Sequence, residues 1–470
     1  MIEVQDYTID VSLQQLISSS QAYHYRVIPI SLENNVLTFK SVATDESLRR
    51  ELAIVFDKEI RLETASAENI EKYLATNFRK TITNKAEALH YTDDFLEKII
   101  MAAKDIGSSD IHFEPYEHSC RIRFRLDGKL KEQYIIPMAE YPVIINKIKI
   151  KAQLDISEKR LPQDGRITIS NVQGEFDIRV SSLPTLHGEK MVLRILSKDA
   201  NHINLEELGF SKEELYTYKE IIKKPNGIIL ISGPTGSGKT TTLYATLKLL
   251  NDTETNILTI EDPIEYTLEG INQVQLKENI GLDFSSTLRT FLRQDPDVIM
   301  VGEIRDAKTA NMAIRAALTG HLVLSTIHTN SAWATISRLI DMDIPPFLIA
   351  STLNMSVAQR LVRKLCNHCK KEQSIETATL PKDVTLPKHI QTHHVPVGCN
   401  ACYQTGYLGR KAIYEIIPIG TELIHHIKQN ETEISAYLKE KNIRTLKDNT
   451  MTLIGNGTTS VDEVYALLSN

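Results

Sequence analysis

The 470-residue sequence lacks any apolar run of the roughly 18 residues that a membrane-spanning helix requires. Its opening segment, MIEVQDYTID, also lacks the basic stretch followed by an apolar stretch that marks a secretory signal. We therefore expect that any association with a membrane depends on a partner or on a surface of the folded protein.

Concentrated positive charge is missing as well. The formal net charge is −6 and the chain contains one tryptophan, whereas proteins that bind nucleic acid usually carry a basic, aromatic-rich face. An obligate nucleic-acid partner is therefore not indicated. A content of 42% hydrophobic and 24% charged residues is typical of globular proteins, and the length predicts about two to four domains.

Cysteine is scarce, but four of the five cysteines form two Cys-x-x-Cys pairs, Cys366 with Cys369 and Cys399 with Cys402. Without an export signal, a metal site in a reducing compartment is favoured over disulfides, with a redox role as the alternative. The pairs supply four thiolates for a tetrahedral zinc site, which would be structural because no coordination position stays open. The 29 residues between the pairs exceed the usual spacing of roughly 15–20, which predicts a small insert within 366–402.

Three segments of different pattern follow one another along the chain. Residues 1–85 combine strand-like and helical stretches, which predicts a small α/β domain, and the polar residues 80–87 are typical of a linker. Residues 90–200 begin with an amphipathic helix at 95–106 and continue mainly with strands, which predicts an α+β domain. Residues 201–470 change to short apolar strands that alternate with helices.

The strands of the third segment are nearly continuous apolar runs, which is typical of a mostly parallel sheet that is covered on both faces. They are expected at Ile228–Ser232, Asn256–Ile260, Val298–Val301 and Leu322–Thr326. The fold class of this segment is therefore predicted to be α/β.

A phosphate-binding loop follows the first of these strands. Its sequence matches Gly-x4-Gly-Lys-Thr, and a helix is expected to begin at about Gly238. Glycines let backbone N–H groups turn toward phosphate oxygens, and the N-terminus of the helix adds a favourable dipole. Lys239 should reach the β- and γ-phosphates of ATP, and the Thr240 hydroxyl should hold Mg²⁺. The predicted nucleotide-binding residues are Gly233, Pro234, Thr235, Gly236, Ser237, Gly238, Lys239, Thr240 and Thr241.

Acidic residues follow at the ends of two other strands. The segment Glu261–Glu265 is placed to polarise an attacking water, and the strand that ends at Glu303 is placed to support the metal or its waters. The alternative for any one of these carboxylates is a helix cap or a solvated turn. Asp306 in particular is a candidate cap for the helix expected from Ala307 to Thr319.

Two histidines, His321 and His328, bracket the strand expected at Leu322–Thr326. At roughly 3.3 Å per residue an extended chain separates them by about 23 Å, so they cannot bind one metal together. His328, at the carboxyl end of the strand, is placed to sense a γ-phosphate, whereas His321 is expected to be structural.

Longer motifs resemble one family. In the second segment they are Ser109–Pro115, Arg121–Gly128, Lys159–Arg166, Arg179–Thr185 and Gly188–Arg194. In the third segment they are Glu261–Glu265, the strand that ends in Gly302 and Glu303, Leu318–Asn330 and Ala358–Cys366. From about residue 90 to 470 the sequence resembles the type II secretion and type IV pilus assembly ATPases, which belong to the superfamily of hexameric secretion motors. The first 85 residues resemble the N-terminal domain of this family more loosely.

The resemblance implies a RecA-like P-loop NTPase core, preceded by an α+β (PAS-like) domain and a small N-terminal α/β domain, with a four-cysteine zinc insert. Glu265 is similar to the family's water-activating glutamate, and Glu303 to its Walker B acid. Arg179 and Arg194 match arginines that swing from the second domain onto the γ-phosphate, where guanidinium groups stabilise transferring charge. A surface salt bridge is the alternative for each of them, and Arg166 is a weaker candidate.

The family also implies an activity, cofactors and partners. The expected protein is a cytoplasmic homo-hexamer that uses ATP, Mg²⁺ and Zn²⁺, converts ATP and water to ADP and phosphate, and drives pilus assembly or type II secretion. Its N-terminal domain would dock onto a platform protein, which would hold the motor peripherally at the inner membrane. The competing interpretations are a P-loop nucleic-acid translocase, which predicts a basic and aromatic channel, and a nucleotide-binding regulator that does not hydrolyse ATP.

Overall fold

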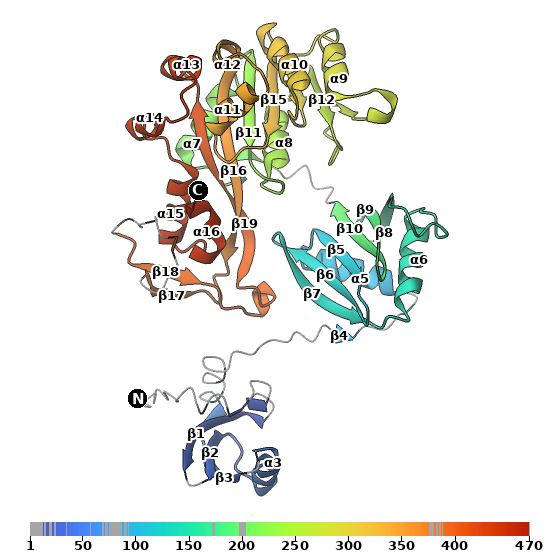
Figure 1. Ribbon diagram of the computed structural model, residues 1–470, viewed down its shortest axis with the longest axis vertical. Helices are drawn as coiled ribbons and strands as arrows, with labels where there is room; N and C mark the ends of the chain where they lie inside the picture. Colours follow the sequence, from blue (N-terminus) through green and yellow to red (C-terminus); the bar gives the residue numbers. More distant parts are fainter. Residues whose placement is uncertain are drawn as a thin grey trace.

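A computed structural model describes residues 25–33, 35–56, 58–67, 94–171, 174–196, 204–375 and 389–469, together with isolated residues between these ranges. Figure 1 shows the chain as a small N-terminal unit followed by two larger units, each of which is built on a seven-stranded sheet. Apart from the short strand at Glu87–Ala88, the sheets of the three units fall within the residue ranges expected for the three domains, although the domain boundaries themselves stay predictions.

The N-terminal unit contains a three-stranded sheet in the order β1-β2-β3. Its elements are β1 (Val27–Glu33), β2 (Val36–Ser41), α3 (Glu46–Phe56) and β3 (Glu59–Thr64). Strand β2 pairs antiparallel with β1 and parallel with β3, so α3 makes the crossover between the parallel strands. The side chains of Leu37, Phe39 and Leu52 are fully buried between the helix and the sheet.

The predicted linker at 80–87 is only partly within the described residues. Positions 80–86 lie outside them, but Glu87 and Ala88 form the short strand β4 (Glu87–Ala88), which pairs with the second sheet. The end of the predicted linker is therefore a strand, because two residues suffice to extend an existing sheet edge by backbone hydrogen bonds.

The second unit is a mainly antiparallel sheet in the order β4-β7-β6-β5-β10-β9-β8. Its other strands are β5 (Asp110–Pro115), β6 (Cys120–Leu126), β7 (Lys129–Ile136), β8 (Gln163–Asn171), β9 (Gly174–Thr185) and β10 (Gly188–Leu196). Helices α5 (Phe95–Asp105) and α6 (Tyr141–Lys151) contribute to the same apolar core. Strands and helices lie close to the positions that the sequence pattern predicts, whereas the PAS-like character of the unit stays a prediction.

The two faces of this second sheet differ in chemistry. Every second residue of β6 is buried, so that Ile122 and Phe124 pack toward α5 and α6 while the arginines between them lie on the opposite face. On that charged face the carboxylate of Glu114 accepts hydrogen bonds from Arg121 (2.9 Å) and Arg123 (2.7 Å). Burial alone would raise the pKa of Glu114, but the hydrogen bonds from Arg123, Lys190 and Arg121 outweigh it and lower this pKa to about 2.

The third unit is a sheet in the order β13-β12-β14-β15-β11-β16-β19, in which only the last pair is antiparallel. Its strands are β11 (Gly227–Ser232), β12 (Ile257–Glu261), β13 (Asn272–Gln275), β14 (Val298–Val301), β15 (Leu322–Ile327), β16 (Leu353–Leu365) and β19 (Tyr407–Pro418).

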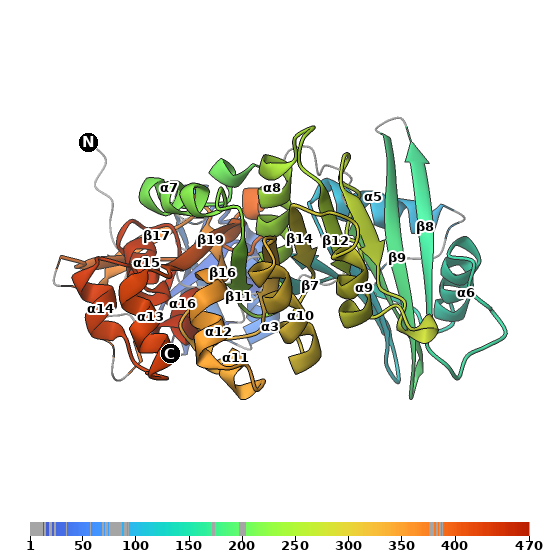
Figure 2. The same cartoon turned by 90° about the horizontal axis from the view of Figure 1, so that it is seen from above.

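Helices cover both faces of the third sheet (Figure 2). On one face lie α7 (Lys212–Ile221) and α8 (Lys239–Leu250); on the other lie α9 (Phe284–Phe291), α10 (Ala307–Leu318), α11 (Ala334–Asp341) and α12 (Pro346–Thr352). Along β11, Ile229 and Ile231 belong to the core on the α8 side, and Ile228 and Leu230 to the core on the α10 side. The prediction of a mostly parallel sheet with two covered faces is confirmed.

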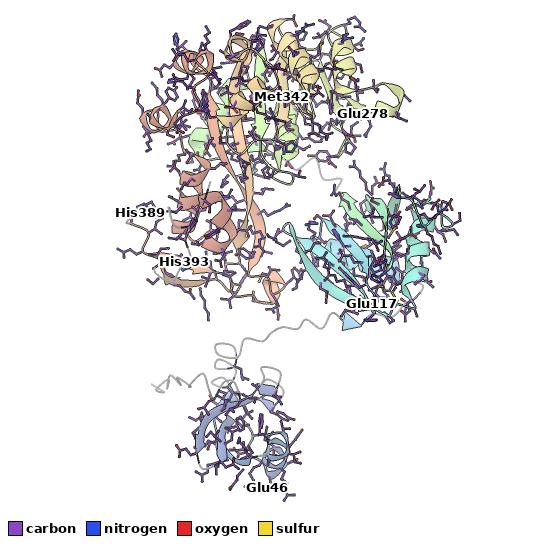
Figure 3. All side chains as sticks on the ribbon, in the orientation of Figure 1. Glu46, Glu117, Glu278, Met342, His389 and His393 are labelled. Carbon is purple, nitrogen blue, oxygen red and sulfur yellow. The ribbon has the colours of Figure 1, made fainter. Side chains whose placement is uncertain are left out.

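The long strands β16 and β19 extend beyond this sheet to the cysteine-containing insert. The insert contains β17 (Lys371–Ser374) and β18 (Thr392–Val395), which pair antiparallel, and Figure 3 labels His389 and His393 within it. The chain then continues through α13 (Thr421–Lys428), α14 (Ser435–Glu440), α15 (Leu446–Gly455) and α16 (Val461–Leu468).

Candidate functional site

The phosphate loop lies between β11 and the N-terminus of α8, as predicted. Gly233, Gly236 and Gly238 have φ values of 149°, 79° and 87°, which only glycine adopts without strain. A Cβ atom at Gly233 would lie 2.4 Å from the carbonyl oxygen of Gln359, so β16 also approaches the loop too closely for any other residue. The loop is therefore shaped by the strand behind it as well as by its own glycines.

Lys239 begins α8 and is buried against the loop. Its Nζ donates hydrogen bonds to the carbonyl oxygens of Gly233 (2.8 Å) and Pro234 (3.1 Å). Burial lowers the pKa of Lys239; the charge of Glu303 acts in the opposite direction, and the charge of Arg360 lowers the pKa further. An ammonium group that is poorly hydrated in this way gains more from a phosphate oxygen than an exposed lysine would.

A cavity of about 760 Å³ lies over the loop, a size that suits a nucleotide. It is bordered by the phosphate loop with the first turn of α8, by the carboxyl ends of β12, β14 and β15, by the second sheet and by β19. The lining residues include Thr235, Gly236, Ser237, Gly238, Lys239, Thr240, Thr241, Glu261, Glu265, Glu303, His328, Asp110, Arg125, Arg194 and Arg410. Residues from both seven-stranded sheets thus meet at one cavity.

Glu303 and His328 follow neighbouring strands and lie close together. The Nε2 atom of His328 is 3.4 Å from the Glu303 carboxylate, which also pairs with Arg305. Burial would raise the pKa of Glu303, but the hydrogen bond and charge of Arg305, followed by His328, hold it below the usual value. The carboxylate therefore stays ionised, as the proposed support of a metal requires.

The other strand-end residues have different surroundings. His321 does not line the cavity; its Nδ1 lies 2.8 Å from the carbonyl oxygen of Ala316, a contact that fits a structural residue. Asp306 caps α10, because its carboxylate accepts the backbone N–H of Thr309 at 2.8 Å. Glu261 is 3% exposed and accepts hydrogen bonds from three side chains, so it is embedded in protein contacts.

Arg179 connects the two sheets directly. It lies on β9 of the second unit, and its Nη1 is 3.2 Å from the carboxylate of Glu265, beyond the end of β12. Its second nitrogen donates to the carbonyl oxygen of Ile264. The arginine predicted to contact a γ-phosphate and the glutamate predicted to activate water are thus paired with each other in this structure.

The other two candidate arginines have different surroundings. Arg194 lines the cavity and is 58% exposed, with its Nε 3.0 Å from the Asp110 carboxylate, which Arg125 also contacts at 3.0 Å. Arg166 pairs with Asp177 on the neighbouring strand and does not line the cavity. Arg179, which contacts Glu265, and Arg194, which lines the cavity, are therefore favoured over Arg166.

Three residues near the loop were not identified from the sequence. Gln359 on β16 donates to the carbonyl oxygen of Ser237 (2.9 Å) and accepts from Thr242 (2.9 Å). Arg360, next to it, is largely buried behind the loop, and Arg410 on β19 lines the cavity. Gln359 and Arg360 fall within the family-like stretch Ala358–Cys366, but its pattern does not indicate contact with the loop, because β16 and β19 come more than a hundred residues after the loop and reach it only through the sheet order.

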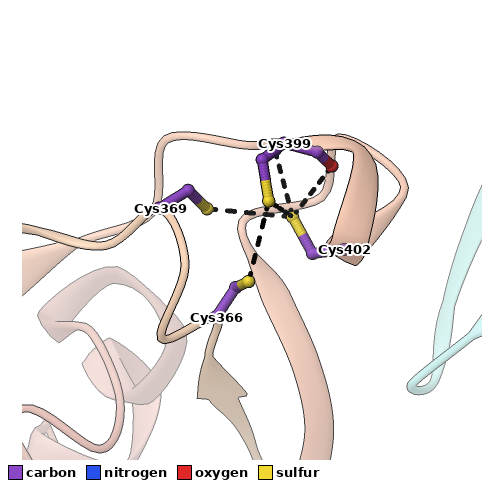
Figure 4. A group of neighbouring side chains, drawn as sticks. All are labelled: Cys366, Cys369, Cys399 and Cys402. Carbon is purple, nitrogen blue, oxygen red and sulfur yellow. Dashed lines mark hydrogen bonds between the residues drawn. The ribbon is translucent and has the colours of Figure 1, made fainter.

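The four predicted cysteines meet in one cluster (Figure 4). Their sulfur atoms all lie within 4.8 Å of one another, with Sγ–Sγ distances of 3.8, 3.8 and 3.7 Å for the pairs Cys366–Cys399, Cys369–Cys402 and Cys399–Cys402. A tetrahedral site with Zn–S bonds of about 2.3 Å requires sulfurs about 3.8 Å apart. The cluster therefore has the dimensions of a four-thiolate metal site and not those of disulfides.

Backbone N–H groups point at these sulfurs. Gly398 donates to Cys369 at 3.3 Å, and Cys399 and Gly406 donate to Cys402 at 3.2 Å each. Burial opposes thiolate formation at Cys402, but the backbone donors outweigh it and lower its pKa to about 7. At Cys402 these donors stabilise the thiolate, which is the form that binds metal, whereas burial raises the pKa of Cys366 and of Cys369.

A strand–loop–helix phosphate cradle on a parallel sheet, with a buried lysine and carboxylates at the neighbouring strand ends, defines a P-loop nucleotide-binding protein. Residues 85–466 match the model of the family described as "Type II/IV secretion system protein". The chain belongs to this family, and the resemblance drawn from its motifs is confirmed.

Two curated relatives illustrate the range of the family. The type IV pilus assembly ATPase PilB of Myxococcus xanthus is 48% identical over 377 residues, which cover 78% of this chain and 66% of that protein. The type II secretion system ATPase E of Vibrio cholerae is 39% identical over 468 residues, which cover 95% of this chain and 92% of that protein. The chain thus matches only about two thirds of the length of the pilus relative but nearly the full length of the secretion relative.

Solved structures share the fold. The Legionella pneumophila ATPase DotB aligns with a TM-score of 0.59 and 21% identity over 81% of this chain and 97% of that one. The pilus retraction motor PilT with bound ADP aligns with a TM-score of 0.53 and 26% identity over 78% of this chain and 95% of that one. The α/β ATPase fold is therefore shown. In the part of the chain that the structure describes, no helix has the length and apolar content to cross a bilayer.

Proposed function

We propose that this protein is a hexameric ATPase that hydrolyses ATP to drive type IV pilus assembly or type II secretion. The observation that carries the proposal is the cavity that joins Lys239 and Glu303 of one sheet to Arg194 of the other. A site that takes its phosphate cradle from one unit and its arginines from another can convert binding into relative motion of the two units. The names of the relatives as assembly and secretion ATPases support the same activity.

The residues would divide the reaction as follows. The phosphate loop and Lys239 bind the β- and γ-phosphates, and Thr240 and Glu303 hold the magnesium ion or its waters. Bound Mg²⁺ would supply charge neutralisation at the phosphates. Glu265 would orient the attacking water and take its proton, after Arg179 has exchanged this carboxylate for the γ-phosphate.

Arg194 and His328 would complete the γ-phosphate side of the site. Arg194 is more than half exposed and lines the cavity, so it can reach a phosphate by a change of rotamer. His328 contacts Glu303, so binding of the γ-phosphate by His328 would change the surroundings of this carboxylate. The products of the proposed reaction are ADP and phosphate.

The four cysteines would hold a structural zinc ion, which fits the sulfur spacing and the closed coordination. The N-terminal 85 residues would dock the motor onto a platform protein of the inner membrane. The protein would then act in the cytoplasm, peripherally attached to that membrane. A net charge of −6 supports a protein partner rather than nucleic acid.

The test compares the full chain with the Glu265→Gln variant. We expect the wild type to release phosphate from Mg·ATP as a hexamer in light scattering. We expect Glu265→Gln to bind ATP but to lose about 100-fold or more in kcat. Equal background turnover in both proteins would support the non-hydrolysing regulator. Stimulation by single-stranded DNA would support the translocase, and a monomer in the presence of ATP would contradict the ring.

A further inference from the structure

We propose that Tyr244 is a positioning residue for Glu265, because its hydroxyl links the helix behind the phosphate loop to the backbone of Glu265. The inference rests on the proposed ATP hydrolysis and names a residue that no motif assigns to it. We call residues 262–270, which follow β12 and carry Glu265, the acidic loop.

Tyr244 lies on α8, the helix that begins with Lys239, and is 1% exposed. Its hydroxyl donates a hydrogen bond to the carboxylate of Glu261, at the end of β12. The same hydroxyl oxygen accepts the backbone N–H of Glu265 at 3.3 Å. One atom of α8 thus contacts both the strand end and the acidic loop.

The direction of these two bonds is determined by their chemistry. A backbone N–H can only donate, so the Tyr244 oxygen must accept from Glu265, and its single hydrogen is left for Glu261. Burial, followed by the charge of Glu261, raises the pKa of Tyr244 above its usual value. The hydroxyl therefore stays protonated and keeps both bonds at neutral pH.

Glu261 is itself anchored by other side chains. Besides Tyr244 it accepts hydrogen bonds from Thr259 Oγ1 (2.7 Å) and from Gln273 Nε2 on β13 (3.0 Å). A buried carboxylate with three donors has little freedom to move, because a change of rotamer would leave charge and donors unsatisfied. Glu261 therefore serves as the fixed end of the link.

The acidic loop is fastened at two further amides. Gln275 accepts the backbone N–H of Ile264 at 3.0 Å, and Gln273 accepts that of Leu268 at 2.7 Å. Both glutamines come from β13, at the edge of the sheet. The bond between Tyr244 and Glu265 is different. It connects the backbone of Glu265 to α8, the helix that presents Lys239 to the phosphates.

This link determines the distance between the proposed water-activating carboxylate and the phosphate cradle. An error of about 1 Å in such a distance can cost on the order of 100-fold in rate. Losing one of the three bonds that side chains make to backbone N–H groups of the loop should cost less, so we expect a loss of about tenfold in kcat.

The test uses Tyr244→Phe, which removes the hydroxyl and keeps the ring. That ring packs edge-to-face on Tyr266 with centroids 4.5 Å apart. Tyr218→Phe is the matched control, because Tyr218 is also fully buried and its hydroxyl lies 2.8 Å from Thr246 Oγ1 on the same helix. Tyr244→Phe removes the hydroxyl bonds to Glu261 and to the acidic loop, whereas Tyr218→Phe removes a bond to Thr246 and leaves the acidic loop untouched.

Steady-state ATP hydrolysis by the full chain then separates positioning from stability. Tyr244→Phe should lower kcat about tenfold with KM for ATP and affinity for ADP unchanged within about twofold. Tyr218→Phe should keep kcat within about twofold even though the loss of its buried hydrogen bond lowers the melting temperature. Equal kcat values in the two variants, or a parallel change of KM, would overturn the inference.

A double variant tests whether Tyr244 acts through Glu265. If it does, Tyr244→Phe should not lower the residual rate of Glu265→Gln any further, whereas independent effects would multiply. A product of the two losses would contradict a positioning role.

Amide hydrogen exchange of the ADP-bound protein gives a result that needs no turnover. Exchange at Glu265 should be faster in Tyr244→Phe than in Tyr218→Phe, and equal exchange would overturn the link. An inactive wild type with this exchange difference would contradict the proposed function alone. An active wild type without the exchange difference would contradict the inference alone.

Discussion

The two seven-stranded sheets bury their faces differently. The third sheet has apolar cores on both faces, and its strands β11 and β14 expose almost nothing. The second sheet has one apolar face, toward α5 and α6, and one face of arginines and carboxylates that pair with each other. Packing holds the side chains of the third sheet in place. Ion pairs hold those of the charged face of the second sheet, and an arginine there can exchange its carboxylate partner for another anion.

The two sides of the cavity differ in the same way, because one comes from the third sheet and the other from the second. On the phosphate side, Lys239 is 9% exposed and Ser237 is 3% exposed. On the side of the second sheet, the side chain of Arg194, which lines the cavity, is 58% exposed, and that of Arg179, which contacts the lining residue Glu265, is 31% exposed. A preformed cradle faces arginines with alternative partners, which is the arrangement that nucleotide-dependent motion between two units requires.

The largest effect on ATP turnover should come from the packed side. Lys239→Ala removes the buried cation at the phosphates, and we expect a loss of about 1,000-fold in kcat/KM. Lys248→Ala, at the exposed far end of the same helix, is the matched control and should stay within about twofold. A phosphate-release assay measures both. Substantial residual turnover in Lys239→Ala would mean that the cradle is not the site of hydrolysis.

The charged side should show the next largest effect. Arg179→Ala should lower kcat about 100-fold while ADP binding stays within about twofold, because the arginine acts on the transferring phosphate and not on the bound diphosphate. Arg166→Ala is the control, since Arg166 lies opposite Arg179 on the neighbouring strand β8 but pairs with Asp177. Equal losses in both variants would assign Arg179 to the stability of the sheet instead.

Removal of the zinc ion proposed for the four cysteines should have a smaller effect on turnover. This experiment tests whether the insert couples the two sheets. The Oδ2 atom of Asp127, in the β6–β7 turn, accepts the backbone N–H of Gly409 at 2.8 Å, close to the cysteine cluster. Lys131 donates to the carbonyl oxygen of Tyr403, the residue after Cys402. Cys366→Ser should therefore lose its zinc and retain a fraction of its turnover, about one fifth, as part of the contact between the sheets loosens.

Metal content by elemental analysis and limited proteolysis within 370–398 provide the measurements for this variant. Cys120→Ser, a change at the buried cysteine outside the cluster, should keep the metal. Full activity in a metal-free protein would show that the insert is independent of the cavity.

The smallest effect on turnover should come from the ion cluster of the second sheet. At pH 7, Glu114→Gln should leave kcat within about twofold but lower the free energy of unfolding by about 2 kcal/mol. The pKa of Glu114 is lowered from 4.5 to about 2 in the folded protein, so its contribution is fully present above about pH 4.5. It is lost as the pH falls toward 2, where the carboxyl group becomes protonated in both states.

Urea unfolding at several pH values checks this expectation. The difference between wild type and Glu114→Gln should shrink between pH 4.5 and pH 2, and a difference that does not depend on pH would contradict the role of the charge. Glu117→Gln, an exposed change in the turn between β5 and β6 (Figure 3), should have little effect at any pH.

The features that the sequence predicted well are local ones. The strand at Val298–Val301 and the helix that begins beside Gly238 are defined by runs of apolar residues and by the glycines of the loop. The four cysteines were identified because a thiolate metal site needs a fixed residue type at a fixed short spacing. Two Cys-x-x-Cys pairs supply the four ligands that one zinc site needs. The sequence alone therefore predicted that the pairs meet across the 29 residues between them.

The features that the sequence did not predict depend on contacts between distant residues. Gln359 and Arg410 reach the phosphate loop because β16 lies beside β11, and β19 beside β16, an order that no local pattern encodes. Tyr244 has the spacing of an ordinary core residue of α8, and only the position of β12 reveals the partners of its hydroxyl. Glu261 belongs to the acidic segment expected after a strand, and only the folded structure reveals the three donors that indicate a supporting role for it.

The ion pair between Arg179 and Glu265 also sets an order of events. When the guanidinium group of Arg179 leaves the Glu265 carboxylate for a phosphate, the same movement frees the proposed base. The arginine therefore reaches the phosphate at the moment when Glu265 becomes able to accept a proton. ATP that binds without approach of the second sheet then stays intact, which suppresses idle turnover. Under the proposed function, this contact makes hydrolysis conditional on the mechanical step that it drives.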